Sequence, residues 1–204
     1  MSLRQWKEIQ TMPRPGSVVM NLPVAWQTPR TAHHNGIQFA VLVTSLGWHG
    51  VSIRDGQLVR LNPPVRSADA VIESMGREPN PQLDESNRVL LRRVEEQLNE
   101  YAEGRRLAFD LPLALEGTDF QLAVWRHLMT IPAGETATYQ SVACAVGNSR
   151  AARAVGGAVA ANPIAIMIPC HRVIRSNGAL GGYAGGSWVK AVLLELERVH
   201  LAGI

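Results

Sequence analysis

Residues 138–161, TYQSVACAVGNSRAARAVGGAVAA, hold two short helical patterns on either side of a tight turn. We expect one helix over residues 138–146, a turn at Gly147-Asn148, and a further helix that begins with Ser149 as its cap. Two short helices joined by a glycine-containing turn outline a helix-turn-helix, although many helical bundles share this outline. The stretch therefore predicts a helical C-terminal half, with DNA binding as one hypothesis.

The second of these helices consists almost entirely of small residues. Residues 151–161 are Ala, Gly and Val apart from Arg153. Gly156 and Gly157 each cost about 1 kcal/mol of helix stability relative to alanine. Small side chains let a helix approach its neighbour closely, and that neighbour is either another helix or a DNA groove. The composition leaves both interpretations open.

Two further helices complete the C-terminal half. Thr118, with Gln121 three residues later, predicts a capping box at the start of a helix that Pro132-Ala133-Gly134 ends. Its apolar residues recur at helical spacing, at Phe120, Val124, Trp125 and Leu128. A last helix over residues 187–201 is expected to bury Val189, Val192, Leu193, Leu196 and Val199.

The N-terminal half alternates strand-like and helical stretches. Residues 38–45 predict a strand, and residues 51–61 predict a hairpin around an Asp55-Gly56 turn. Helices are expected near residues 67–75 and over residues 86–102, the second with an apolar face of Val89, Leu90, Val94, Leu98 and Tyr101. Because residues 110–117 read as a connector, we predict an α+β protein with an N-terminal domain, 1–112, and a C-terminal domain, 117–204.

Composition and charge narrow the class of protein. Of 204 residues, 46% are hydrophobic and 18% charged, which excludes a disordered chain. Residues 1–116 hold 13 basic and 13 acidic residues, whereas residues 117–204 hold seven basic and four acidic ones. The excess of +3 in the C-terminal part is a weak hint of an anionic partner, and taken alone it is better explained by ordinary scatter of surface charge.

No membrane or export signal is evident in the sequence. The longest apolar run, residues 151–168, is interrupted by Arg153 and Asn162-Pro163, so it does not predict a transmembrane helix. The first eight residues lack the apolar centre of a signal peptide. We therefore expect a cytoplasmic protein without a membrane partner.

Two cysteines, Cys144 and Cys170, are too few for a disulfide framework or a cysteine-rich metal site. Cys144 lies among Ala143, Ala145 and Val146, so we expect a buried and inert thiol. Both thiols should be free in a reducing compartment, and only a special environment would make one reactive.

Cys170 has neighbours that suit a nucleophile. It follows the apolar segment 164–168, which predicts a buried strand or extended segment, and Pro169; His171 and Arg172 come next. A nearby base or cation favours the thiolate, but adjacent side chains of an extended segment point to opposite faces. We therefore expect His171 to reach Cys170 through a water molecule. The last helix offers two carboxylates to orient His171, Glu195 and Glu197, and helical periodicity does not choose between them.

Residues 176–186, SNGALGGYAGG, form a glycine-rich loop that can wrap closely around a flat ligand. The loop lacks the pattern of a phosphate-binding loop, because no lysine and serine or threonine follow its glycines at the required spacing.

The segment 169–173, PCHRV, resembles the active-site signature of the O6-alkylguanine-DNA alkyltransferases, also called methylated-DNA–protein-cysteine methyltransferases. The resemblance extends in order over residues 117–204. It includes Gly117-Thr118-x-Phe120-Gln121-x-x-Val124-Trp125, Ile131-Pro132-x-Gly134, Thr138-Tyr139, Arg153-Ala154-Val155-Gly156, Asn162-Pro163, Gly178, Gly181-x-Tyr183-x-Gly185-Gly186 and Lys190-x-x-Leu193-Leu194-x-x-Glu197.

The resemblance implies a reaction and its catalytic residues. DNA repair would proceed by irreversible, single-turnover transfer of an alkyl group from O6-alkylguanine, and from O4-methylthymine, to Cys170. His171 would deprotonate Cys170 through water, and Glu197 would orient His171. Tyr139 would bond the purine, protonate it and crowd the neighbouring phosphate. Asn162 would stiffen the turn between the recognition helix and the active site.

The resemblance also implies how DNA is held. Arg153 would enter the duplex in place of the flipped base, and the small-residue helix would lie in the minor groove through Ala152, Ala154, Gly156 and Gly157. The substrate pocket would be lined by Tyr183, Ala184, Val173 and Gly181, with the Cys170 and Val173 carbonyls reading the exocyclic amine.

The implied architecture joins a ribonuclease H-like N-terminal domain to a helical, winged helix-turn-helix-like C-terminal domain in a monomer. Where many members of the family have serine, this chain has Ala184, and only its backbone amide is invoked. Some relatives hold zinc in the N-terminal domain, but residues 1–116 contain no cysteine, so we expect no zinc and no cofactor.

Two alternatives differ in class from an alkyltransferase. The first is a cysteine hydrolase that uses Cys170, His171 and Glu197, although hydrolases usually take nucleophile and base from separate elements. The second is a DNA-binding relative that recognises alkylated bases without chemistry, but such proteins lack the acceptor cysteine that is present here. Turnover of an ester or amide would favour the first, and DNA binding without thiol alkylation the second.

Overall fold

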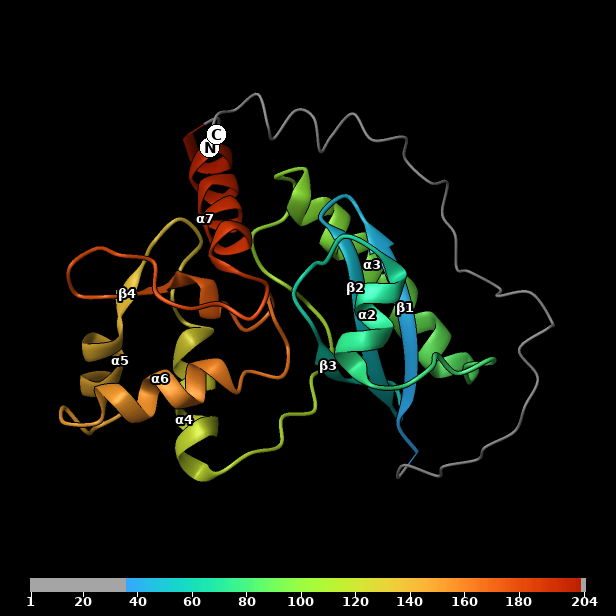
Figure 1. The fold of residues 1–204 in the computed structure, drawn as a ribbon, viewed down its shortest axis with the longest axis horizontal. Helices are drawn as coiled ribbons and strands as arrows, with labels where there is room; N and C mark the ends of the chain where they lie inside the picture. The colour runs from blue at the N-terminus through green and yellow to red at the C-terminus, as the bar shows by residue number, and fades with distance from the viewer. Residues whose placement is uncertain (1–35, 203–204) are drawn as a thin grey trace.

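The computed structural model describes residues 36–202, which form an α+β structure in two parts (Figure 1). We call residues 36–116 the sheet region and residues 117–202 the helical region. Residues 1–35, which belong to the predicted N-terminal domain, lie outside the described residues. None of the described helices is both long and apolar enough to cross a membrane.

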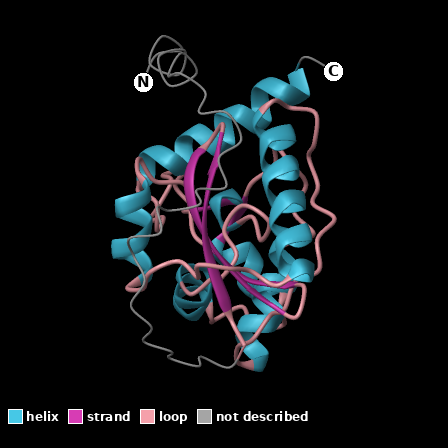
Figure 2. Cartoon of the chain, turned by 90° about the vertical axis from the view of Figure 1, so that its right-hand side faces the viewer, coloured by secondary structure: helices cyan, strands magenta, loops and turns pink. Residues whose placement is uncertain are grey.

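The sheet region is built on an antiparallel three-stranded sheet in the order β1-β2-β3. Its elements are β1 Gln38–Thr44, β2 Gly47–Arg54, β3 Gln57–Leu61, α2 Ala68–Met75 and α3 Glu85–Ala102. The predicted hairpin is confirmed: Asp55 and Gly56 both have positive φ, 51° and 69°, as a tight two-residue turn requires. Helices α2 and α3 lie on opposite sides of the strands (Figure 2).

Helix α3 buries most of its predicted apolar face against the sheet. Leu90, Val94, Leu98 and Tyr101 are buried as expected. Val89 is 49% exposed, so its assignment to this face was wrong. Consecutive helical residues point about 100° apart, and the buried stripe runs through Leu90 and its neighbours one turn along.

The edge of β3 that faces away from β2 pairs with the segment that leads to Cys170. The backbone N–H of Leu61 donates to the Pro163 carbonyl at 2.9 Å, and Ala165 N–H donates to the Leu61 carbonyl at 2.8 Å. The expected strand over residues 164–168 is therefore wrong in extent, because pairing stops at Ala165. The chain then turns at Ile166, whose φ of 71° is rare for a β-branched residue.

The helical region contains mostly short elements. They are α4 Asp119–Leu128, β4 Ala137–Thr138, α5 Tyr139–Ala145, α6 Ala152–Ala160, the 3₁₀ turn η2 Cys170–Arg172, β5 Val173–Ile174 and α7 Ser187–Ala202. The capping box of Thr118 and Gln121 is confirmed. Ser149 does not cap α6, because that helix begins later and Ala151 occupies its N-cap without a side-chain bond.

Helix α5 shows why the prediction for Cys144 was wrong. Val142 and Ala143 are buried against the core, whereas Cys144 is exposed. The helix is amphipathic despite its apolar composition, and Cys144 falls on its outer face, where Gln140 Nε2 lies 3.7 Å from its Sγ. On α7, similarly, Val189, Leu193 and Leu196 are buried, but Val192 is only half-buried and Val199 is 43% exposed.

Candidate functional site

Cys170 lies at the start of η2 and is buried, with 6% of its surface exposed. Its backbone N–H donates to the Ile168 carbonyl at 2.7 Å. Residues 170–172 form a 3₁₀ turn instead of continuing an extended segment, so their side chains point in three directions. The thiol and the imidazole of His171 therefore lie close in sequence without a direct hydrogen bond between them among the described contacts.

Glu197 on α7 is the centre of a buried hydrogen-bond network. One carboxylate oxygen, Oε1, lies 2.9 Å from His171 Nε2 and accepts hydrogen bonds from Tyr101 Oη at 2.7 Å and from Arg172 Nη2 at 2.7 Å. The other, Oε2, accepts from the Gly134 backbone N–H at 2.9 Å. These contacts decide between the two glutamates that periodicity left open.

Glu195 has a different environment. It is exposed and pairs with Arg198 on the same helix at 2.6 Å, which lowers the pKa of its carboxyl group. It makes no described contact with His171.

The network sets the charge on Glu197 and His171. Burial alone would raise the pKa of Glu197, but hydrogen bonds from His171 and Arg172 outweigh it, so the pKa lies well below its usual value. Burial lowers the pKa of His171; the Glu197 carboxylate opposes this effect, and the positive charges of Arg172 and Lys190 add to it. At neutral pH the site therefore holds an ionised carboxylate and a neutral imidazole.

The tautomer of His171 follows from these contacts. An ionised carboxylate only accepts hydrogen bonds, so His171 Nε2 carries the proton. His171 Nδ1 is then an unprotonated acceptor, and it is buried without a partner among residues 36–202. Buried polar atoms are normally paired, so this nitrogen is suited to accept a proton from a water or a ligand.

The Cys170 thiol is protonated at neutral pH. Burial raises its pKa, and the Asn162 side chain, the Lys190 ammonium and the local backbone amides only partly offset the increase. The expectation that neighbouring cations favour the thiolate therefore needs correction, because the guanidinium of Arg172 is bound to Glu197 and the Ile131 carbonyl. A reaction at this thiol requires a base to remove its proton.

Asn162 and Lys190 fix the backbone on either side of the thiol. Asn162 Nδ2 donates to the Ile168 carbonyl at 2.8 Å, and its Oδ1 accepts from Ile164 N–H at 3.0 Å, so this side chain spans the turn before Cys170. Lys190 is buried, and its Nζ donates to the Val173 carbonyl at 2.5 Å.

Two tyrosines lie near the thiol. Tyr139, at the start of α5, is half-buried, and a Cβ added to Gly181 would lie 3.1 Å from its hydroxyl oxygen. Gly181 also has a φ of 72°, so this approach requires glycine on both counts. The Tyr183 hydroxyl is buried and has no partner among the described residues, and burial raises its pKa. Ala184 next to it is exposed.

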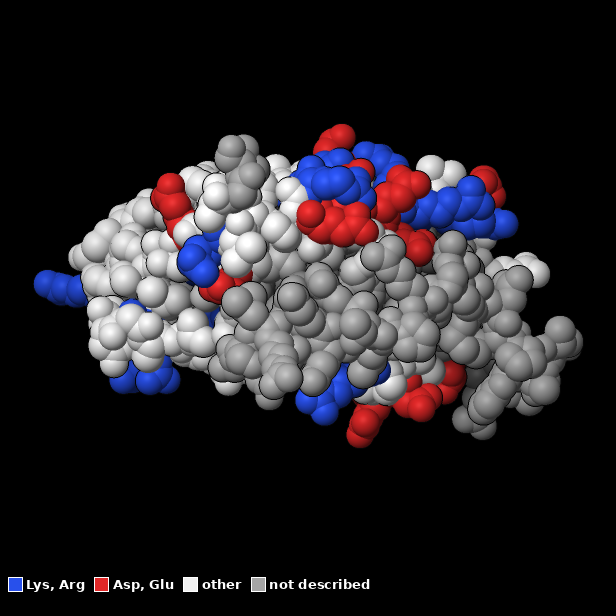
Figure 3. Space-filling view, turned by 90° about the horizontal axis from the view of Figure 1, so that it is seen from above, with Lys and Arg blue, Asp and Glu red and all other residues white. Residues whose placement is uncertain are grey.

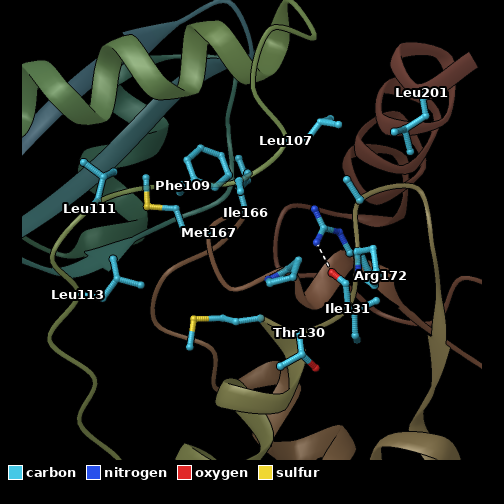
Figure 4. Close-up of a pocket in the computed structure, with 15 residues that line it drawn as sticks. Leu107, Phe109, Leu111, Leu113, Thr130, Ile131, Ile166, Met167, Arg172 and Leu201 are labelled. Atoms are coloured by element: carbon cyan, nitrogen blue, oxygen red, sulfur yellow. Dashed lines mark hydrogen bonds between the residues drawn. The ribbon is translucent and has the colours of Figure 1, made fainter. Parts of the chain in front are cut away.

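A cavity of about 440 Å³ lies between the two regions and is lined by residues of both, including Pro169 and Arg172 (Figure 4). Its lining includes Phe109, Met167 and Arg172, whose guanidinium points toward the Ile131 carbonyl in Figure 4. Its lining includes none of the four residues predicted to form the substrate pocket.

Helix α6 presents two distinct faces. Val155, Ala158 and Val159 are buried against α4 and α5, and Trp125 Nε1 donates to the Ala158 carbonyl at 2.8 Å. The opposite face exposes small residues and the one arginine: Arg153, Ala154, Gly157 and Ala160, with Ala152 and Gly156 half-buried beside them. A Cβ at Gly157 would meet nothing within 4 Å, so the exposed face is smooth and open. The packing interpretation of the small residues is confirmed on the buried face, and the exposed face leaves room for the approach of another molecule.

The two regions carry charge differently. In the sheet region, acidic and basic side chains are intermixed (Figure 3), and arginines pair with glutamates, as Arg106 does with Glu100 at 2.6 Å. In the helical region Arg172, Lys190 and Glu197 are buried, which leaves five exposed arginines against three exposed acidic residues. The exposed arginines Arg150, Arg153 and Arg175 give this region a basic surface.

Tyr101 and Gly134 were not identified from the sequence as parts of the site; Arg172 was considered only as a cation beside the thiol, and Lys190 was given no role there. A buried tyrosine hydroxyl needs a partner, so Tyr101 on an apolar helix face was a signal that something polar faces it. Its partner Glu197 is 96 residues away, and no local pattern could name it.

Known proteins resemble this chain in both sequence and structure. Residues 119–199 match the family model described as 6-O-methylguanine DNA methyltransferase, DNA binding domain. A methylated-DNA–protein-cysteine methyltransferase of Methanosarcina barkeri is 53% identical over 115 residues, which are 56% of this chain and 73% of the relative. An inducible methyltransferase of the same name from Bacillus subtilis is 48% identical over 102 residues, 50% of this chain and 57% of the relative.

Among solved structures, the O6-methylguanine methyltransferase of Mycobacterium tuberculosis matches 80% of this chain and 94% of its own, with 36% identity and a TM-score of 0.67. A structure of the same bacterium's protein in complex with DNA matches 78% of this chain and 92% of its own, with 38% identity and a TM-score of 0.65.

Proposed function

Because the chain belongs to the methylated-DNA–protein-cysteine methyltransferase family, we propose that it repairs DNA by moving alkyl groups from O6-alkylguanine to Cys170. O4-methylthymine is a second substrate. The observation that carries the proposal is a buried, neutral His171 next to Cys170 in the sequence, held by Glu197 at Nε2 and without a partner at Nδ1 among residues 36–202. This arrangement holds a base beside a protonated thiol.

The reaction balances without any cofactor. His171 Nδ1 takes the thiol proton through a water molecule, Cys170 Sγ forms a bond to the alkyl carbon, and the carbon–O6 bond breaks. The Tyr139 hydroxyl protonates the purine, so that neutral guanine leaves, and the proton held by His171 returns to Tyr139 through solvent. No oxidation state changes, and because a thiolate is a poor leaving group from an alkyl thioether, the thiol is not restored and each molecule acts once.

The DNA is double-stranded and is approached from its minor groove. The exposed small residues of α6 let the helix backbone lie close to the groove floor, and Arg153 occupies the space that the flipped base vacates. Extrusion is needed because O6 lies inside the stacked duplex, out of reach of a buried thiol.

The flipped base binds between Tyr139, Tyr183 and the glycine loop at Gly181. The Ala184 backbone amide donates a hydrogen bond to the polar edge of the base, and the carbonyls of Cys170 and Val173 accept hydrogen bonds from it. Lys190 supports this role, since its contact with the Val173 carbonyl holds that oxygen in place and leaves its second lone pair for a ligand.

We also propose the finer architecture that the sequence implied. Residues 1–112 form a ribonuclease H-like domain, and residues 117–204 form a winged helix-turn-helix-like domain. The protein acts as a monomer, without metal, in the cytoplasm, where Cys170 stays reduced.

Intact-protein mass spectrometry tests the proposal. With excess O6-methylguanine duplex, we expect one added methyl group per chain and then no further reaction, with the methyl mapped to Cys170. Cys170→Ser should still bind DNA and accept no methyl, whereas Cys144→Ala should react like the wild type.

The control is stringent because Cys144 is the more exposed of the two thiols. A methyl group on Cys144 would contradict the proposal. Ester or amide turnover beyond one equivalent would favour a hydrolase, and DNA binding without any alkylation would favour a non-enzymatic binder.

A further inference from the structure

Tyr101 is the one side chain of the sheet region that directly contacts the Glu197 carboxylate in the described structure. It lies near the end of α3, is fully buried, and its hydroxyl donates to Glu197 Oε1 at 2.7 Å. Its ring packs against Phe109 with centroids 5.4 Å apart and a tilt of 43°. Contacts within the sheet region therefore fix the position of the ring independently of the hydrogen bond between its hydroxyl and the carboxylate.

We propose that Tyr101 is a positioning residue for alkyl transfer, whose hydroxyl holds the Glu197 oxygen that His171 uses. The inference rests on the proposed function and adds to it a contribution from outside the region that carries the nucleophile.

The geometry of the shared oxygen supports this role. Oε1 is shared by three groups, Tyr101 Oη, His171 Nε2 and Arg172 Nη2, at 2.7 to 2.9 Å. A carboxylate with fewer partners could rotate about its χ angles, and His171 would lose its fixed orientation. The Tyr101 hydroxyl adds a contact from α3 to those from η2 and from the Gly134 backbone, so the carboxylate is held from several directions.

The same contact influences whether His171 can act as a base. The charged and titratable groups facing the imidazole are Glu197 and Lys190 from α7 and Arg172 from η2, with Tyr101 from α3 bonded to Glu197. A carboxylate that shares its charge with Tyr101 and Arg172 attracts a second imidazole proton less strongly. Without the hydroxyl, the pKa of His171 should rise, and less of the imidazole would be neutral at a given pH.

The test compares Tyr101→Phe with Gln97→Met. Phenylalanine keeps the ring and its contact with Phe109 and removes only the hydroxyl. Gln97 lies one turn earlier on α3 and exchanges hydrogen bonds with the Asp110 backbone at 3.1 and 2.9 Å, so its loss weakens the same helix without touching Glu197. Single-turnover methyl transfer is measured from about pH 5 to about pH 9, and NMR follows the ring nitrogens of His171 in the free protein.

We expect Tyr101→Phe to slow transfer at pH 7 by about threefold to tenfold and to shift the acid limb upward by about half a pH unit or more. The NMR titration of His171 should shift in the same direction. Gln97→Met should lower the melting temperature and leave both the acid limb and the titration in place.

An unchanged His171 titration in Tyr101→Phe would overturn the inference, whatever the rate. A loss of rate in proportion to unfolded protein, equal in both variants, would assign Tyr101 a structural role only. If the wild type transfers no methyl to Cys170, the proposed function fails, while the NMR comparison still decides whether Tyr101 controls His171.

Discussion

The sheet region and the helical region each bury a histidine completely, and the two rings are satisfied in different ways. In the sheet region, His49 Nε2 lies 3.1 Å from Thr44 Oγ1 and its Nδ1 lies 3.2 Å from the Asn62 carbonyl. In the helical region, His171 has Glu197 at Nε2 and no described partner at Nδ1. Both ring nitrogens of His49 have a hydrogen-bond partner, and we call it the closed histidine. Only one nitrogen of His171 has a partner among the described residues, and we call it the open histidine.

The difference separates scaffold from site. Burial lowers the pKa of both histidines, that of His49 to about 4, so burial and a shifted pKa do not by themselves indicate function. His171 differs from His49 in having an unpaired nitrogen among the described residues and a cysteine as its neighbour in the sequence. Within residues 36–202, the buried side-chain nitrogens and oxygens without partners are His171 Nδ1, Tyr183 Oη and His200 Nδ1, all in the helical region. His171 follows Cys170 in the sequence, and Tyr183 lies close enough to Cys170 for the charge of the cysteine to raise its pKa.

The largest effect is expected when the partner of the open histidine is changed. Glu197→Gln removes the charge that orients His171 and leaves Arg172 buried without its anion, so transfer should slow by about a hundredfold or more. Glu195→Gln, which breaks only an exposed pair with Arg198, should change the rate by less than about twofold. The measurement is the single-turnover rate per folded molecule, with folding checked by circular dichroism. Equal rates in the two variants would remove Glu197 from the mechanism.

An intermediate effect is expected from the closed histidine, and it concerns stability. The folded-state pKa of His49 lies below its unfolded value of about 6.5, so its contribution is fully present above pH 6.5 and is lost as the pH falls toward 4. The shift from 6.5 to about 4 corresponds to at most about 3 kcal/mol. Denaturant unfolding between pH 7 and pH 4 should therefore show a shallower decline in His49→Gln than in the wild type.

The pKa of His171 is also lowered, so its protonation reduces the stability of the protein on the acid side of neutrality as well. His171→Gln thus measures the contribution of the helical region separately. If the free energy of unfolding falls with decreasing pH as steeply in His49→Gln as in the wild type, then His49 is not a neutral side chain with both ring nitrogens bonded.

The smallest effect is expected on the exposed face of α6. Arg153→Ala should slow repair of duplex DNA by about tenfold and leave the reaction with free O6-benzylguanine within about twofold, because only the duplex requires base extrusion. Rates on both substrates are measured with the same preparation. Tyr139→Phe is the matched comparison and should slow both reactions, since it removes the proton donor. Equal loss on both substrates in Arg153→Ala would exclude the role of Arg153 in the duplex.

Features encoded by neighbouring residues were predictable from the sequence. The hairpin at Asp55-Gly56 follows from two residues that tolerate positive φ, and the start of α4 follows from Thr118 and Gln121. Cys170 and His171 could be proposed as site residues because their motif is contiguous.

Features that depend on contacts between distant segments were not predictable. Glu195 and Glu197 have similar local surroundings, and only the position of α7 against η2 buries one of them. Cys144 was misplaced because an alanine-rich helix does not reveal which face meets the core. The turn at Ile166 depends on the sheet edge at Leu61, a partner more than 100 residues away.

Glu197 also determines how the site can open. Its two oxygens bind groups from α3, from the turn at Gly134 and from η2, so a fluctuation that lifts α7 breaks all of these bonds together. In hydrogen-exchange terms, the Gly134 amide, whose acceptor is Glu197 itself, should exchange only through that shared opening. The two residues that follow the nucleophile are therefore released as part of one cooperative unit, and the protection of the Gly134 amide reports the stability of the junction between the two halves of the protein.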